Sequence, residues 1–78
     1  MNREQIENIV KNLIHDAVAP QANINLSDNL SYDLGLGSYD KMFLLSEVED
    51  TFGIIMPDDC MDQINTVADL IDAIEQRI

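Results

Sequence analysis

The first 17 residues have the hydrophobic spacing of an amphipathic helix. Apolar residues recur at intervals of three and four, which places them on one helical face, at Ile6, Ile9, Val10, Leu13, Ile14 and Ala17. Charged and amide side chains fill most of the other positions. Pro20 follows, and proline disfavours helical geometry in the residue before it. We therefore predict a first helix that ends shortly before Pro20.

Residues 18–37 show no regular hydrophobic spacing and are rich in Asn, Ser, Asp and Gly. A connection of about 20 residues is long for a compact domain and is usually functional or disordered. Apolar side chains nevertheless occur along it, at Leu26, Leu30, Tyr32, Leu34 and Leu36. We expect these residues to hold the loop against the core, which favours a functional loop over a mobile linker.

A second helix is predicted to begin at Ser38. Serine is preferred at a helix N-cap, and Gly37 before it allows the chain to turn. An apolar stripe follows at helical spacing, formed by Met42, Leu44, Leu45, Val48 and Phe52. Gly53 is a natural stop for this helix because glycine readily adopts the left-handed conformation of a C-terminal cap.

The remaining sequence predicts one short helix and one longer one. Residues 58–63 are enough for one or two helical turns. The last helix opens at Thr66, with Asp69 three residues on as in a capping box. Its apolar face consists of Val67, Leu70, Ile71, Ile74 and Ile78. We therefore predict a single all-α domain over residues 1–78, a small four-helix bundle with three main amphipathic helices, one short helix and a long first loop.

Composition refines this picture. Hydrophobic residues make up 46% of the chain, with two Phe, two Tyr and no Trp, so the predicted core is aliphatic. Fifteen acidic residues against four basic ones give a formal net charge of -11. Such a surface repels nucleic acid and anionic membranes, and it attracts partners with basic patches. We therefore expect no nucleic-acid binding.

A single cysteine, Cys60, cannot form an intramolecular disulfide, which indicates a reducing compartment. No apolar run approaches the length of a signal peptide or a membrane span. We expect a monomeric cytoplasmic protein without membrane insertion.

Motifs of known enzyme classes are missing from the sequence. It contains no HExxH, no Cys-x-x-Cys, no Walker loop and no GxSxG elbow. The one histidine, His15, lies in a different helix from Ser38, which disfavours a catalytic triad. The glycines do not bring oxygen ligands into the register of a calcium-binding loop. We expect neither catalysis nor a metal site.

Ser38 remains as the candidate for chemistry. On local sequence alone it is an ordinary helix cap. A serine at a helix start is also exposed, and that end of the helix dipole stabilises anions, so a phosphodiester on this hydroxyl would be favoured electrostatically.

The sequence around Ser38 resembles the attachment region of acyl carrier proteins. The matching residues are Asp33-Leu34-Gly35-Leu36-Gly37-Ser38-Tyr39-Asp40, then Leu44-Leu45, Glu47-Val48-Glu49-Asp50 and Phe52. The likeness continues through Ile55-Met56-Pro57-Asp58-Asp59 and Ile64-Asn65-Thr66-Val67-Ala68-Asp69-Leu70. It covers nearly the whole chain, and its specificity lies in the joint spacing of these segments.

This resemblance implies that Ser38 receives phosphopantetheine from coenzyme A through a phosphopantetheinyl transferase, and that the arm carries acyl groups as thioesters. It implies fatty-acid-like or polyketide-like cargo, sheltered between the helices. It also implies that acidic residues dock the basic patches of the transferase and of acyl-loading and acyl-processing enzymes, namely Asp40, Glu47, Glu49, Asp50 and Asp58.

Two alternatives stay open. One is an aminoacyl or peptidyl carrier, which Gly35-x-Gly37-Ser38 matches in part; the other is an unmodified interaction module of the same fold. The chain departs from the family pattern where Gly37 replaces an aspartate and Tyr39 a leucine. It departs again at Phe43, often acidic in fatty-acid carriers, and at Ser46, usually apolar or small. These departures favour a carrier dedicated to a specialised pathway.

Overall fold

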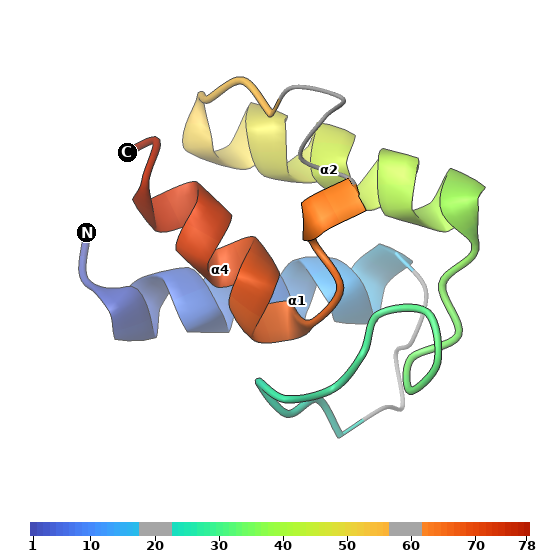
Figure 1. Cartoon of the computed structure of the whole chain (residues 1–78). Helices are drawn as coiled ribbons and strands as arrows, with labels where there is room; N and C mark the ends of the chain where they lie inside the picture. Colours follow the sequence, from blue (N-terminus) through green and yellow to red (C-terminus); the bar gives the residue numbers. More distant parts are fainter. Residues whose placement is uncertain (18–22, 57–61) are drawn as a thin grey trace.

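The chain folds as a group of α-helices, as predicted. The computed structural model describes residues 1–17, 23–56 and 62–78. These ranges contain three helices and no β-strand: α1 (Arg3–Ala17), α2 (Ser38–Phe52) and α4 (Val67–Glu75). Helix α1 contacts both others. Figure 1 shows α1 and α2 running in opposite directions, with both chain termini at the end of the molecule away from the start of α2.

The short helix predicted at residues 58–63 falls largely outside the described residues. Within that stretch the structure describes Asp62 and Gln63, and both have helical backbone geometry. Cys60 lies outside the described residues, and so does Asp58 of the predicted docking set. The count of four helices therefore remains a prediction.

The core is aliphatic, as expected from the composition. Every buried side chain among the described residues is Ile, Leu, Val or Met, and none is polar or charged. The helices supply Ile6, Val10, Ile14, Leu44, Leu45, Val48, Val67, Leu70, Ile71 and Ile74. The segments between them add Ile24, Leu30, Leu36, Met56 and Ile64. Each helix thus gives one face to a single core, which suits a chain too short to build a second.

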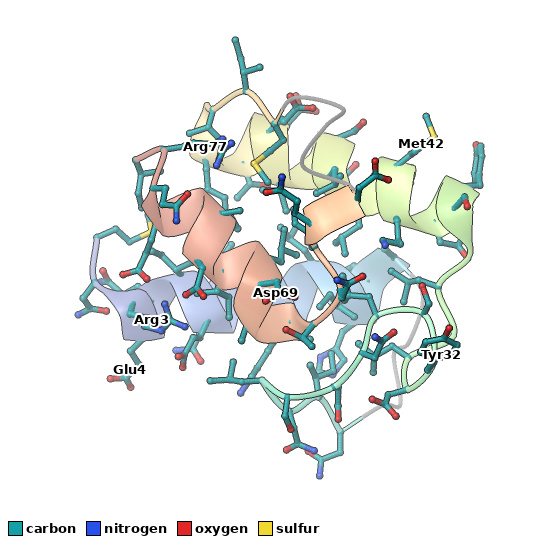
Figure 2. The ribbon with its side chains drawn as sticks, viewed as in Figure 1. Arg3, Glu4, Tyr32, Met42, Asp69 and Arg77 are labelled. Carbon is teal, nitrogen blue, oxygen red and sulfur yellow. The ribbon has the colours of Figure 1, made fainter. Side chains whose placement is uncertain are left out.

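Two residues assigned to apolar faces lie on the surface instead. Met42 is 57% exposed and Ile78 is 51% exposed, and Figure 2 shows Met42 projecting outward from α2. Met42 is two residues from Leu44 and so lies about 200° away from it around the helix. Ile78 comes after the last residue of α4, Glu75, where helical spacing no longer applies. These two assignments were wrong because the buried stripes are narrower and shorter than predicted.

Backbone hydrogen bonds tie the long loop to the start of α4. The Leu30 N–H donates to the Asn65 carbonyl at 2.8 Å, and the Val67 N–H donates to the Asp28 carbonyl at 3.0 Å. An isolated antiparallel bridge joins the residues between them. Two segments far apart in sequence are therefore fixed against each other.

Apolar side chains of the loop reinforce this attachment, as predicted. Leu30 and Leu36 are each 2% exposed, and Leu26 and Leu34 pack partly buried against the core. The prediction was wrong for Tyr32, which is 90% exposed and lies at the outer edge of the loop (Figure 2). Tyr32 belongs to a turn whose backbone faces inward toward the side chain of Asn29, and its own side chain points out.

The capping box predicted at Thr66 and Asp69 is confirmed. The Asp69 N–H donates to Thr66 Oγ1 at 3.1 Å, and the Thr66 N–H donates to Asp69 Oδ2 at 3.0 Å. The same oxygen accepts a bond from the Asn65 N–H at 3.0 Å. Because the N–H groups of Thr66 and Asn65 bind the ionised carboxylate, they lower the pKa of Asp69.

Arg3 links the start of α1 to the end of α4. Its Nη1 lies 2.8 Å from Asp72 Oδ1 and also pairs with Glu75, while its Nε lies 3.6 Å from Glu7 Oε1. Hydrogen bonds to Asp72 and Glu75 raise the pKa of Arg3. These pairs are exposed, so each contributes little to stability. Their position matters more, because they neutralise acidic residues at the end remote from the start of α2.

Replacing Asp69 with alanine should destabilise the fold in a pH-dependent way. At pH 7 the free energy of unfolding should fall by about 1–2 kcal/mol, because both halves of the capping box are lost. The pKa of Asp69 is lower in the folded state than its unfolded-state value of about 3.9. The stabilisation by its carboxylate is therefore fully present above the unfolded-state pKa and is lost as the pH falls through the folded-state pKa. Urea unfolding of the wild type and of Asp69→Ala at pH 7 and pH 3 measures the difference in their free energies of unfolding.

The expected result is a gap between wild type and Asp69→Ala that narrows at pH 3. Asp50→Ala, which removes an exposed acid from α2, is the control and should shift stability by no more than about 0.5 kcal/mol. A gap of equal size at both pH values would show that the carboxylate charge does not stabilise the cap.

Candidate functional site

Ser38 is the first residue of α2, and its side chain is exposed. The N-cap itself is Gly37, with extended backbone angles of φ -78 and ψ -179. The Gly37 carbonyl accepts the first helical hydrogen bond, from the Lys41 N–H at 3.0 Å. The prediction that Ser38 caps the helix was therefore wrong by one residue.

The carboxylate of Asp40 takes the place of a capping serine. Its Oδ2 accepts a hydrogen bond from the Gly37 N–H at 3.3 Å, which is one half of a capping box. Gly37 has no side chain with which to return the bond. The Ser38 hydroxyl is consequently not used in capping, and it makes no hydrogen bond with any residue in the described part of the chain. It is free to react.

The loop before Ser38 is fixed within two residues of it. The buried Leu36 donates its N–H to the Leu30 carbonyl at 2.9 Å. Gly35 has φ +74, in the left-handed region that favours glycine, and this turn lets Leu36 enter the core. The exposed serine is thus held between a buried leucine and a rigid helix.

The start of α2 is suited to an anion. The first helical bond comes from Lys41, which leaves the N–H groups of Ser38, Tyr39 and Asp40 without a partner inside the helix. These groups and the helix dipole give that end a partial positive charge. A Cβ built on Gly37 would meet nothing within 4 Å, so the space beside Ser38 is open. A phosphodiester on the Ser38 hydroxyl therefore fits the site in both charge and room.

Three of the predicted docking residues lie along α2 at solvent-accessible positions. Asp40 and Glu47 are half-buried and Asp50 is exposed. Glu47 is seven residues, or about two turns, from Asp40 and so lies near it around the helix. Asp50 follows Glu47 by three residues on a neighbouring line. The structure thus gives α2 a row of carboxylates that leads away from Ser38.

Glu49 is placed differently from the other three. It lies half a turn around α2 from Asp40 by helical spacing. Its Oε2 accepts a hydrogen bond from the Met56 N–H at 2.9 Å. Gly53, in the left-handed conformation with φ 66, donates its N–H to the Glu49 carbonyl at 2.8 Å, which confirms the predicted helix stop. Glu49 therefore stabilises the turn that follows α2.

Sequence reasoning did not identify the exposed apolar residues near Ser38. Tyr39 is 80% exposed, Met42 is 57% exposed and Phe43 is 48% exposed. The sequence marks Tyr39 and Phe43 only as departures from the family pattern, and the apolar spacing places Met42 in the buried stripe of α2. The signal was available, because all three lie off the line of Leu44 and Val48 around the helix.

Two other features, a metal site and a membrane-spanning helix, can be assessed for the described residues. No three of their His, Cys, Asp and Glu side chains come together in a way that would hold a metal ion. None of their helices is long and apolar enough to cross a membrane.

Comparisons with known proteins show which family the chain resembles. A family model described as the phosphopantetheine attachment site matches residues 4–74. The chain is 37% identical to an acyl carrier protein of Coprothermobacter proteolyticus, over 100% of this chain and 96% of that protein. It is also 37% identical to one from Amoebophilus asiaticus, over 100% of this chain and 92% of that protein.

A solved structure of a protein from Mycobacterium tuberculosis has a similar fold. The TM-score is 0.86 at 25% sequence identity, covering 91% of this chain and 96% of the other. The similarity therefore extends over nearly the whole molecule.

Ser38→Ala should leave the fold as stable as the wild type. The hydroxyl caps nothing, and alanine is a good helix former, so the free energy of unfolding should change by less than about 0.5 kcal/mol. Thr66→Ala is the matched control, because Thr66 does cap its helix, and it should cost about 1 kcal/mol. Urea unfolding compares the two. Equal losses would mean that Ser38 supports the helix start after all.

Proposed function

The chain belongs to the acyl carrier protein family, and we propose that Ser38 is the residue that bears its phosphopantetheine. As a member, it is an acyl carrier protein with a covalently attached phosphopantetheine group. One observation carries the choice of Ser38: its hydroxyl is exposed at the first turn of a helix that other residues cap.

The other described serines lack this combination. Ser46 is exposed but lies in the middle of α2, where backbone N–H groups are used within the helix. Ser27 and Ser31 lie in turns of the long loop. Ser27 lies beside the start of α4, but the N–H groups of Val67 and Ala68 already bond to the carbonyls of Asp28 and Leu26. Ser31 and Ser46 are not at a helix start, so a phosphodiester there would lack the positive end of a helix.

The role of the protein follows from what the arm carries. When attached, the group supplies a terminal thiol that holds acyl groups as thioesters. Ser38 fixes the base of the arm, and the helix start stabilises the negative charge there. We take fatty-acid-like or polyketide-like intermediates as the cargo, because the relatives are named acyl carrier proteins, and this favours acyl over aminoacyl groups.

Partner enzymes would dock on the acidic row of α2. Asp40, Glu47 and Asp50 line the helix that begins at Ser38, so a basic surface held there finds the arm within reach. Complementary charge mainly accelerates encounter and sets orientation. The expected partners are the phosphopantetheinyl transferase and acyl-handling enzymes with basic patches, and the carrier itself supplies no catalytic group.

The choice of Ser38 is tested by modification in vitro. Incubation with coenzyme A and a broad-specificity phosphopantetheinyl transferase should add one phosphopantetheinyl group to the wild type, measured by intact mass. The control Ser46→Ala should gain the same group, and Ser38→Ala should gain none. A Ser38→Ala protein that is still modified contradicts the assignment, and a wild type that gains nothing contradicts the carrier function.

The docking row is tested by charge reversal. Asp50→Lys should lower kcat/KM of the transferase several-fold at low salt through slower association, with the loss shrinking as salt screens the charges. Glu4→Lys changes the net charge equally, at an exposed position on α1 near the N-terminus (Figure 2). Equal losses in the two variants would show that total charge, and not a docking row, controls the rate.

A further inference from the structure

Tyr39, Met42 and Phe43 form a continuous exposed surface on the first turns of α2, here called the aromatic face. The residues are spaced by three and four along the helix, so their side chains are neighbours. Their exposed fractions are 80%, 57% and 48%. By contrast, Phe52 near the other end of α2 packs partly buried against the core. Contiguous exposed apolar residues mark interaction sites more often than isolated ones do.

Two shallow hollows adjoin Phe43. One is lined by Tyr39, Met42, Phe43 and Ser46. The other lies between α1 and α2 and is lined by Leu13, Asp16, Ala17, Phe43 and Glu47. Phe43 is common to both and therefore stands between them. The aromatic face thus continues across Phe43 onto the C-terminal turn of α1.

The charges at the second hollow determine what can occupy it. Its walls are apolar at Leu13, Ala17 and Phe43, and its charged members are the acids Asp16 and Glu47. A second copy of this chain would bring acid against acid, in a molecule whose formal net charge is already -11. An anionic lipid surface would be repelled in the same way. The fitting occupant is a protein surface with an apolar side chain beside Lys or Arg.

The position of the aromatic face near Ser38 indicates which partner enzyme with a basic surface docks on it. Met42 lies one turn after Ser38 on nearly the same line of α2, and Tyr39 directly follows Ser38, so an enzyme whose active centre encloses the Ser38 hydroxyl comes close to this face. Enzymes that act on the far end of the arm need not approach so closely. The enzyme that reacts at the hydroxyl itself is the phosphopantetheinyl transferase.

We propose that the aromatic face and the hollow between α1 and α2 form the docking surface for the phosphopantetheinyl transferase. An apolar side chain of the transferase packs against Phe43 and Leu13, and a basic side chain pairs with Asp16 and Glu47. This proposal rests on the proposed function. The docking surface described under the proposed function, the acidic row, lies on α2 alone. The present proposal extends it to α1.

Transferase kinetics with coenzyme A and a broad-specificity transferase test the apolar part. Phe43→Ala should raise KM for the carrier on the order of tenfold, the loss typical of an aromatic residue at the centre of an interface, and leave kcat within about twofold. Ile78→Ala is the matched control, because Ile78 is 51% exposed and lies at the C-terminus. Its KM should stay at the wild-type value. A thermal melt of each variant confirms that it is folded.

The charged part is tested by its salt dependence. The double variant Asp16→Asn with Glu47→Gln should raise KM at low salt and flatten its dependence on salt. Glu4→Lys changes the net charge by the same amount and should leave that dependence close to wild type.

The outcomes distinguish a failure of the carrier function from a failure of the docking surface. A wild type that is not modified overturns the carrier function. A modified wild type with an unchanged KM in Phe43→Ala, or with an equal rise in Ile78→Ala, leaves that function standing and overturns the docking surface. A wild-type dimer in sedimentation that Phe43→Ala dissociates would assign the face to a second copy and overturn it as well.

Discussion

The burial of Leu30 and Leu36 is the interaction on which the position of Ser38 depends. Both leucines enter the core from residues 23–37, the described part of the loop, which contains no helix or strand to stiffen it. The Leu30 N–H bonds to the Asn65 carbonyl just before α4, and the Leu36 N–H bonds to the Leu30 carbonyl. A mobile loop would let the start of α2 fray. With the loop fixed, the exposed serine stands on a rigid base, which suits the proposed site of attachment.

The charged side chains lie where they do not disturb the apolar packing that positions Ser38. No charged side chain is buried among the described residues, so the strong acidity of the chain imposes no desolvation cost on the core. Acids that serve the fold act at backbone N–H groups, as Asp69 does at α4 and Glu49 does after α2. Arg3 engages Glu7, Asp72 and Glu75 at the far end. At the start of α2, Asp40 likewise accepts from the Gly37 N–H, and the ion pairs of Arg3 include no acid of α2.

Sequence reasoning correctly predicted the three described helices, whose positions follow from the local spacing of apolar residues. It was wrong about which way several individual side chains point. The spacing of apolar residues gave the positions of the three described helices, and the Thr66 capping box and the stop at Gly53 were correct. It placed the cap on Ser38, because serine is a preferred N-cap residue and Gly37 has no side chain that would mark a capping box with Asp40. It placed Met42 and Tyr32 inside, because apolar character does not tell which way a side chain points. The errors at Ser38 and Met42 fell at the site, and correcting them leaves the Ser38 hydroxyl outside the helix cap and an apolar surface next to it.

Locating the phosphopantetheinyl group on the modified chain tests the central claim most directly. Fragmentation by tandem mass spectrometry of the wild-type protein, after reaction with coenzyme A and the transferase, assigns the added mass to a single side chain. The structure predicts the whole of it on Ser38, with Ser27, Ser31 and Ser46 unmodified. The added mass on one of those three serines would contradict the account.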